Sequence, residues 1–349
     1  MKPTDIAQPD YFHKVVDCQW ACPAHTPVPE YIRLIAQGRY DDAYLVNWKS
    51  NVFPGILGRT CDRPCEPACR RVRVEEGSPE HRKAHAKPEA VAICRLKRAA
   101  ADYKGDIRPH LPKPAAKGNG KRVALVGAGP ASLTVARDLA PHGYHCVVFD
   151  GDPKAGGMMR TQIPKFRLPD RVIDEECGYV LDLGVEFRAG TRVDSMAALL
   201  AEGYDAVFVG SGAPRGRDLD IPGRREAAKR IHIGIDWLSS VSFGHTTSIG
   251  KRVVVLGGGN TAMDCCRSAR RLGGEEVHVV VRSGFDEMKA SPWEKEDAAH
   301  EGIPIHNFLV PKAFLHEHGI LRGITFDKVE ARYDSKGRRE LVPTGEPEV

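Results

Sequence analysis

The sequence lacks any long apolar run and any apolar segment near its start. No stretch approaches the roughly 18 consecutive apolar residues that a membrane-spanning helix needs. The opening residues, MKPTDIAQPDYFHK, contain no hydrophobic core of a secretory signal. Both absences count against a membrane protein or a membrane partner, and they predict a cytoplasmic protein.

The sequence also has little excess of one charge over the other. The chain carries 51 Lys and Arg against 46 Asp and Glu, which gives a formal net charge of +5. So weak a balance counts against a nucleic-acid partner and supports at most an attraction to acidic proteins or phosphorylated cofactors. The 349 residues suffice for two or three domains, each with its own core.

Cysteine is sparse in most of the chain and dense near its beginning. Of ten cysteines, the four that follow residue 100 are Cys146, Cys177, Cys265 and Cys266. The others are Cys18, Cys22, Cys61, Cys65, Cys69 and Cys94. In a reducing compartment such a cluster predicts metal binding rather than a framework of disulfides.

Three zones of different composition follow one another. Residues 1–103 are Cys-rich with a pattern of short helices, residues 104–120 are rich in Pro, Gly and Lys and predict a linker, and an α/β pattern begins at residue 121. Its strand, glycine turn, helix and strand occur twice, and such apolar strands joined by helices favour parallel sheets. We therefore predict an α/β fold with two Rossmann-like dinucleotide-binding domains, 121–247 and 248–349, after an α-helical domain.

The first glycine turn joins a strand to a helix and consists of Gly127, Ala128, Gly129, Pro130, Ala131 and Ser132. Gly127 permits the tight turn, and Gly129 lets the backbone approach a pyrophosphate at the helix N-terminus. Asp150 ends the next strand, where its carboxylate can accept hydrogen bonds from ribose hydroxyls. We expect a dinucleotide without a 2′-phosphate here. A purely structural turn is the alternative, because glycine turns are common.

The second glycine turn repeats this geometry with Gly257, Gly258, Gly259, Asn260, Thr261 and Ala262. The following strand ends in Arg282, at the place that Asp150 holds in the first unit. A carboxylate there would repel a 2′-phosphate, whereas a guanidinium can bind it through a fork of hydrogen bonds. NADP(H) is therefore favoured over NAD(H). Lys289 and Arg271 are candidates for further positive charge, although Arg271 is equally well explained as a solvated surface residue.

We therefore predict that each domain binds its own cofactor, FAD in residues 121–247 and NADPH in residues 248–349. Hydride would pass from the nicotinamide ring to the flavin, and the main task of the protein would be to orient the two rings. Such a transfer requires no side-chain acid or nucleophile, and the sequence offers no convincing catalytic residue.

The early cysteines form two motifs, Cys18-x3-Cys22-Pro23 and Cys61-x3-Cys65-x3-Cys69. The first resembles the end of a ferredoxin-type motif, and we predict one or two [4Fe–4S] clusters in residues 1–103. Zinc is the alternative, although zinc sites usually have C-x2-C pairs in closed sets of four ligands. Two clusters need about eight ligands. With Cys94 as an extra ligand the chain can complete one cluster, and a second would need other ligands or another subunit.

Together these motifs resemble those of the small (beta) subunit of NADPH-dependent glutamate synthase and of the N-terminal half of dihydropyrimidine dehydrogenase. The resemblance covers almost the whole chain and rests on CPAHTPVPEYI, GRTCDRPCEPACRR, GAGPASLTVARDLA, AGGMMRTQIPKFRLP, GGGNTAMDCCRSARRLG and VVRSGFDEMKASPWE. It implies an NADPH:acceptor oxidoreductase, an electron-input subunit that passes hydride to FAD and electrons to [4Fe–4S] clusters and a partner. That partner would be a glutamate synthase large subunit, a ferredoxin or another reductase, in a homo- or hetero-oligomer.

The resemblance also implies which residues bind each group. FAD would contact Gly127, Ala128, Gly129, Pro130, Ala131, Asp150, Gly156, Gly157, Met158, Arg167 and Val193. NADPH would contact Gly258, Gly259, Asn260, Thr261, Arg282 and Lys289. The cluster ligands would be Cys18, Cys22, Cys61, Cys65 and Cys69.

The chain departs from the family pattern in three places. Residues 1–17 lack the C-x2-C pair that the family usually has upstream, and Lys97 stands where the family has a Gln or Glu ligand, with Cys94 one turn earlier as a candidate replacement. The chain also stops at Val349 without the second flavin-binding stretch and its Gly-Asp motif. We therefore expect a fragment or truncated product that lacks the C-terminal part of the FAD domain, unless another chain completes the fold.

Two other functions stay open. A truncated chain could be a nucleotide- and cluster-binding module without flavin catalysis. Cys265 and Cys266 suggest a disulfide reductase of the thioredoxin reductase type, but adjacent cysteines on a helix point to different sides and are better explained by core packing.

Overall fold

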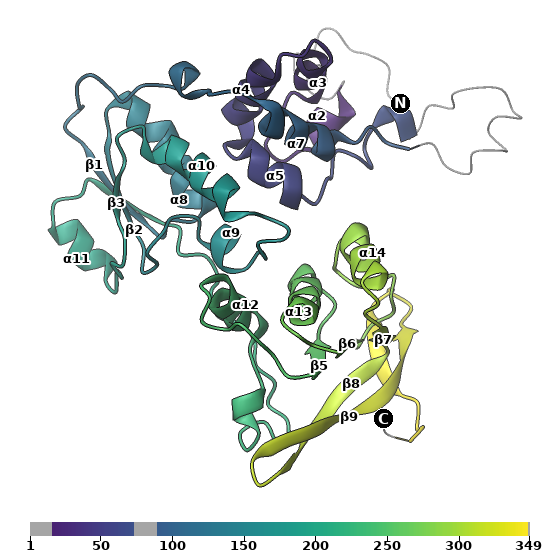
Figure 1. Cartoon of the computed structure of the whole chain (residues 1–349). Helices are drawn as coiled ribbons and strands as arrows, with labels where there is room; N and C mark the ends of the chain where they lie inside the picture. The colour runs from purple at the N-terminus through teal and green to yellow at the C-terminus, as the bar shows by residue number, and fades with distance from the viewer. Residues whose placement is uncertain (1–15, 73–88, 348–349) are drawn as a thin grey trace, which may run out of the picture. The chain divides into compact units, whose positions relative to one another are not determined.

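The structure, a computed structural model, describes residues 16–72 and 89–347 and separates into two compact units (Figure 1). Unit 1 runs to Met159 and includes Phe166–Ser211. Unit 2 consists of Arg160–Lys165 and the chain from Gly212 onward. The domain boundaries expected at residues 103, 120 and 247 stay predictions.

Unit 1 begins with a helical segment, as the sequence predicts. Gly38 has a φ of +73° and separates two of its helices, while Pro54 begins another at a position where its missing N–H costs nothing. The helices pack around Tyr31, which has no exposed surface. They are α2 (Asp17–Ala21), α3 (Val28–Ala36), α4 (Tyr40–Asn51), α5 (Pro54–Thr60), the 3-10 turn η1 (Arg70–Val72) and α7 (Ile93–Tyr103).

The second part of unit 1 is a four-stranded parallel sheet in the order β3-β2-β1-β4, which confirms the predicted parallel α/β pattern. Helices α8 and α10 lie on one side of the sheet and α11 on the other (Figure 1). The strands are β1 (Arg122–Val126), β2 (His145–Phe149), β3 (Glu186–Arg188) and β4 (Ala206–Val209). The helices are α8 (Pro130–Leu139), η3 (Ala140–His142), α9 (Met158–Thr161), α10 (Asp170–Leu181) and α11 (Met196–Ala201).

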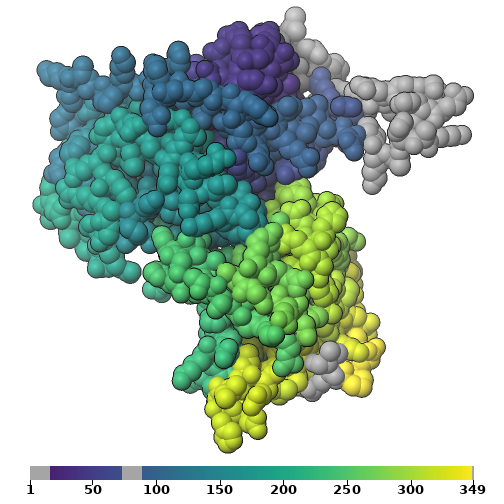
Figure 2. Space-filling view, in the orientation of Figure 1, coloured from purple at the N-terminus to yellow at the C-terminus, as the bar shows by residue number. Residues whose placement is uncertain are grey.

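The segment 104–120 joins the two parts of unit 1 and is partly built into the core. Around the short turn η2 (Arg108–His110), Ile107 is fully buried and Leu111 is 8% exposed. Both pack with Tyr44 of α4 and Tyr179 of α10. In the space-filling view the helical and sheet-bearing parts of unit 1 have a continuous surface (Figure 2).

Unit 2 repeats the strand–turn–helix pattern in a parallel sheet of order β5-β6-β7. Valines on one face of the sheet pack against the helices, and Met263 at the centre of this core is fully buried. The elements are η4 (Ala228–Arg230), α12 (Gly234–Ser242), β5 (Arg252–Leu256), α13 (Asn260–Arg271), β6 (Glu276–Val281), α14 (Pro292–His300) and β7 (Ile305–Asn307).

An antiparallel sheet of order β10-β9-β8 completes the described part of unit 2 and was not expected from the sequence. Its strands are β8 (Leu309–Glu317), β9 (Ile320–Tyr333) and β10 (Arg339–Pro343). His318 and Gly319 both have positive φ and form the tight turn between the first two strands. Among the described residues, no helix has the length and apolar character needed to cross a bilayer.

Candidate functional site

The first glycine turn has a backbone geometry that a side chain would prevent. Gly127 has a φ of +94° and donates its N–H to Phe149 O at 2.7 Å. A Cβ atom at Gly127 would lie 2.6 Å from Gly210 O, so a larger residue would force β1 and β4 apart. The turn leads directly into α8, with Gly129 as its N-cap and Pro130 in its first turn.

A second pair of glycines lies against this turn. Gly156 donates its N–H to Ala128 O at 2.9 Å. Gly157 has a φ of +50°, and a Cβ atom there would lie 2.7 Å from the Gly129 Cα atom. Two backbone segments without side chains thus meet at the N-terminus of α8. This cradle fits the pyrophosphate of a dinucleotide, which needs close backbone approach and free N–H groups.

Replacing Gly157 by alanine is expected to weaken FAD binding by about tenfold, because the methyl group would combine backbone strain with a clash against the cradle. The affinity can be measured by titrating FAD into the apoprotein. Gly151→Ala is the control, since a Cβ atom at Gly151 meets nothing within 4 Å and its φ is ordinary. Equal FAD affinity in the two variants would contradict this assignment of the cradle.

Asp150 follows β2 directly and is bound to the same turn. Its Oδ2 accepts the Ala128 N–H at 2.5 Å, and its Oδ1 accepts the Asp152 N–H at 2.9 Å. Each carboxylate oxygen can accept a further hydrogen bond, so a ribose hydroxyl can be bound as well.

The other residues implied for FAD lie around the cradle. Met158 is 51% exposed at the start of α9, and Val193 packs at the edge of the core that contains Phe149. Arg167 is half-buried in the segment before α10. The cradle and Asp150 are therefore brought together by the structure, while the roles of Met158, Arg167 and Val193 stay predictions.

The second glycine turn is equally restricted. Gly257 has a φ of +135° and donates its N–H to Val280 O at 3.0 Å. A Cβ atom at Gly258 would lie 2.8 Å from Val281 Cγ1. Gly259 is the N-cap of α13, which Asn260 and Thr261 then begin. A backbone cradle for a second pyrophosphate therefore opens at this helix N-terminus.

A later loop holds this turn in place. Gly258 O accepts the Ala290 N–H at 2.9 Å, and Asn260 Oδ1 accepts the Ser291 N–H at 2.8 Å. Ser291 is the N-cap position of α14 and was not singled out from the sequence. Its place before Pro292 is the signal of a helix start that was available.

Arg282 follows β6 directly, as Asp150 follows β2. Arg282 and Lys289 are both exposed, and within the described part of the chain neither has an ion-pair partner. Arg271 differs, because it lies at the far end of α13 and pairs with Glu301 at 2.6 Å. Arg282 and Lys289 stay predicted contacts of a 2′-phosphate, whereas Arg271 is a surface ion-pair residue.

Two of the candidate cluster ligands meet at the end of α5. Cys61 is the C-cap residue of this helix, and the Cys94 thiol of α7 donates hydrogen bonds toward Leu57 O at 3.2 Å and Gly58 O at 3.5 Å. A hydrogen bond with Cys94 lowers the pKa of Cys61 and raises that of Cys94. Both thiols therefore lie at the C-terminal end of α5.

The remaining candidate cysteines belong to the same small domain. Cys65 and Cys69 are buried, and Cys18 packs against the core around Tyr31. Cys22 Sγ lies 3.6 Å from Thr26 Oγ1. All these thiols are free, but among residues 16–72 and 89–347 no three His, Cys, Asp or Glu side chains converge as a metal site would require. The donors thus have the right chemistry for an iron–sulfur cluster, and the ligand set stays a prediction.

Cys265 and Cys266 lie in the core of unit 2 and are 7% and 0% exposed. Their sulfurs contact different carbonyl groups, Gly234 O for Cys265 and Met263 O for Cys266. Burial raises the pKa of both thiols. Thiol–disulfide exchange requires an accessible thiolate, so the packing interpretation fits these two residues better.

Two family descriptions match the chain. Residues 121–335 match the family of pyridine nucleotide-disulphide oxidoreductases, and residues 12–108 match the 4Fe-4S cluster domain II of dihydropyrimidine dehydrogenase. The fold is also similar to FprA from Mycobacterium tuberculosis, with a TM-score of 0.55 and 20% identity, over 66% of this chain and 68% of FprA. This likeness supports the Rossmann-type fold of the sheets.

Two curated relatives match almost the whole chain. The beta subunit of the NADP(+)-dependent formate dehydrogenase of Moorella thermoacetica is 36% identical over 93% of this chain and 48% of its own length. The small chain of the NADPH glutamate synthase of Escherichia coli strain K12 is 32% identical over 94% of this chain and 71% of its own length. The chain therefore spans about half of the formate dehydrogenase subunit. With its two glycine cradles and its cysteine-bearing helical domain, the chain belongs to the family of NAD(P)H-dependent FAD and iron–sulfur oxidoreductases that includes the glutamate synthase small chain.

Proposed function

We propose that this chain is the electron-input subunit of an NADPH:acceptor oxidoreductase. One observation carries the proposal: the residue that follows the second parallel strand is acidic in unit 1, Asp150, and basic in unit 2, Arg282. A carboxylate selects a ribose with free hydroxyls, and a guanidinium selects a ribose that carries a 2′-phosphate. FAD in unit 1 and NADPH in unit 2 satisfy this difference.

The residues of the chain bind and orient the cofactors rather than react. Bound FAD would supply the chemistry, since a flavin accepts a hydride and releases its electrons one at a time. Gly127, Gly129 and Gly157 would hold its pyrophosphate, and Asp150 its ribose. Gly258, Gly259 and Arg282 would hold NADPH, with Lys289 as a second cation.

The cysteine-bearing domain would pass electrons onward. The formate dehydrogenase and glutamate synthase relatives are named as a beta subunit and a small chain. By analogy, the electron acceptor of this chain is another protein, either a glutamate synthase large subunit or a ferredoxin-like protein. The candidate ligands of its cluster are Cys18, Cys22, Cys61, Cys65 and Cys69, with Cys94 as an additional one.

A second candidate function is a nucleotide- and cluster-binding module without flavin catalysis. Among the described residues, β4 is an edge strand of the sheet in unit 1 and exposes the apolar side chain of Val209 at 57%. Apolar edge strands are places where a further strand pairs. If the FAD pocket requires such strands from another chain, this chain alone would bind FAD poorly.

A visible spectrum of anaerobically purified protein, recorded before and after addition of NADPH, separates the two candidates. Bleaching of resolved flavin bands together with loss of a broad iron–sulfur shoulder is the result expected for the oxidoreductase. A spectrum with the iron–sulfur shoulder but no flavin bands would favour the binding module. A colourless protein that still binds NADPH would refute both.

A further inference from the structure

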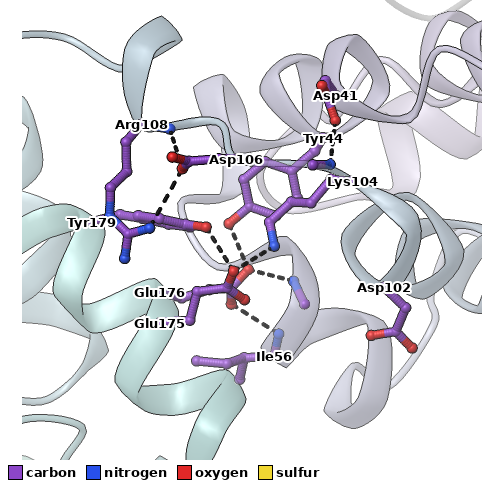
Figure 3. A network of polar contacts seen from close by, with 12 residues as sticks. Asp41, Tyr44, Ile56, Asp102, Lys104, Asp106, Arg108, Glu175, Glu176 and Tyr179 are labelled. Atoms are coloured by element: carbon purple, nitrogen blue, oxygen red, sulfur yellow. Dashed lines mark hydrogen bonds and ion pairs between the residues drawn. The ribbon is translucent and has the colours of Figure 1, made fainter.

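Glu176 of α10 is a buried acid that neither nucleotide site uses. It is 1% exposed, and its carboxylate accepts three hydrogen bonds from the helical segment of unit 1 (Figure 3). The donors are the Tyr44 hydroxyl at 2.7 Å, the Gly55 N–H at 2.6 Å and the Ile56 N–H at 2.9 Å. One side chain of the sheet-bearing part thus binds both α4 and α5.

The fit around this carboxylate is close. A Cβ atom at Gly55 would lie 3.0 Å from Glu176 Oε1, so the backbone of α5 approaches the acid more closely than another residue would allow. Burial raises the pKa of Glu176 to about 7, although the two N–H groups and the Tyr44 hydroxyl lower it. The first N–H groups of a helix have no partner within the helix. Glu176 accepts hydrogen bonds from two such groups of α5, those of Gly55 and Ile56.

A ring of polar and aromatic groups surrounds the buried acid. Lys104 Nζ pairs with Glu175 Oε1 at 2.7 Å, and the same oxygen accepts the Tyr179 hydroxyl at 2.7 Å. Lys104 Nζ also lies 5.1 Å from the centre of the Tyr44 ring and 5.8 Å from that of Tyr179. The Lys104 side chain is only 5% exposed, so the ring separates the acid from water.

Helix α5 connects this acid to the cysteines. Its seven residues begin beside Glu176 and span about 10 Å at 1.5 Å per residue, and Cys61 follows as the C-cap. Leu57 O and Gly58 O of the same helix face the Cys94 thiol. A Cβ atom at Gly58 would lie 2.7 Å from the Arg98 backbone, so α5 and α7 are in close contact. A shift of α5 would therefore move Cys61 and Cys94 as well.

Helix α10, which carries Glu176, is also linked to the first glycine cradle. Helix α10 packs against α8, and α8 begins at Gly129. A second link joins α4 to α8, because Arg137 Nη1 donates to Trp48 O at 2.9 Å and the guanidinium lies 4.9 Å from the centre of the Trp48 ring. The cysteine-bearing helix and the cradle are thus fixed to one frame inside unit 1.

We propose that Glu176 is a positioning residue that fixes α5 and its cysteines against the first nucleotide-binding fold, and that it thereby sets the rate at which electrons leave FAD. The inference rests on the proposed function, because it needs FAD in the cradle and a redox centre on the cysteines. Glu176 touches neither group. Its effect is on the geometry of transfer, and such geometry strongly controls rates.

Glu176→Gln tests this inference in the full chain. Glutamine keeps the size of the side chain but turns an amide NH2 toward one of three donors, so at least one hydrogen bond is lost. Glu175→Gln is the matched control, since it lies on the same helix turn and leaves the three bonds to Glu176 in place. Tyr44→Phe removes one donor only and serves if Glu176→Gln does not fold.

The first measurement needs no cofactor. In Glu176→Gln, amide exchange over residues 55–60 and alkylation of Cys94 are expected to become about tenfold faster than in the wild type and in Glu175→Gln. Tyr44→Phe should give a smaller change in the same direction. Unchanged exchange and alkylation in both folded variants would overturn the inference.

The second measurement follows the loaded protein by rapid mixing with NADPH. Reduction of FAD should stay within about twofold of the wild type, while transfer from reduced FAD to the iron–sulfur centre should slow about tenfold. Equal slowing of both steps would overturn the positioning role, since a general loss of structure affects both. If purified protein holds no FAD or iron, the proposed function fails, whereas the exchange measurement still decides whether Glu176 fixes α5.

Discussion

Replacing Arg282 by alanine is expected to lower kcat/KM for NADPH about 100-fold and to leave kcat/KM for NADH within about twofold. A charged, forked contact with a 2′-phosphate contributes about 1.5–3 kcal/mol, which corresponds to a factor of roughly 10 to 150. NADH has no 2′-phosphate and makes no such contact. Arg282 is exposed directly after β6, so its loss leaves no cavity and no buried group without a partner.

Steady-state rates with both coenzymes and an artificial electron acceptor measure this effect. Arg271→Ala is the control, because it removes the same charge from the other end of α13, where Arg271 pairs with Glu301. The control should not change the ratio of NADPH to NADH activity. A similar loss with both coenzymes in Arg282→Ala would show that Arg282 supports the fold of the loop rather than the 2′-phosphate.

The strand–turn–helix units could be predicted because their signals are local. The apolar strands 122–126 and 252–256 are each followed within a few residues by glycines and a helix, and both parallel sheets formed as expected. Asp150 and Arg282 were found in the same way, since each ends the next strand. Within the described residues, the positions that sequence reasoning located best are those whose neighbours lie close in the chain.

Contacts between distant segments could not be predicted in this way. Glu176 meets Gly55 across 121 residues of sequence, and nothing in the stretch around either residue indicates the other. For the same reason, segment 104–120 has the composition of a linker although Ile107 is fully buried. The antiparallel sheet was missed because β8 and β9 alternate only weakly between apolar and polar residues, and few positions of either strand are fully buried.

The cysteine positions could be predicted only in part from the sequence. Spacing identified Cys61, Cys65 and Cys69 as one group, and the helix pattern placed Cys94 on α7. Only the packing of α5 on α7 shows that the Cys94 thiol lies against the last turn of α5, which Cys61 follows. The pairing of ligands with clusters depends on such packing rather than on intervals in the sequence.

The buried guanidinium of Arg267 links α13 to α14 in unit 2. It is 7% exposed on α13 and pairs with Glu294 at 3.1 Å, Asp297 at 3.0 Å and Glu301 at 2.9 Å. All three acids lie on α14 or at its end. Because α14 begins at Ser291, which binds Asn260 of the glycine turn, the network links the core of unit 2 to the turn.

Replacing Arg267 by alanine is expected to lower the free energy of unfolding of unit 2 by about 3–5 kcal/mol, the cost of breaking a buried ion pair by removing one side of it. Urea unfolding followed by circular dichroism measures the loss, and Arg271→Ala should cost less than about 1 kcal/mol because that side chain is 43% exposed. Glu294 is only 5% exposed, so the cost should come mainly from removing the positive charge that faces this buried acid. Adding Glu294→Gln to Arg267→Ala should therefore restore part of the stability. If the double variant is less stable than Arg267→Ala alone, the loss comes from the cavity, and the charge network is not what fixes α14 against α13.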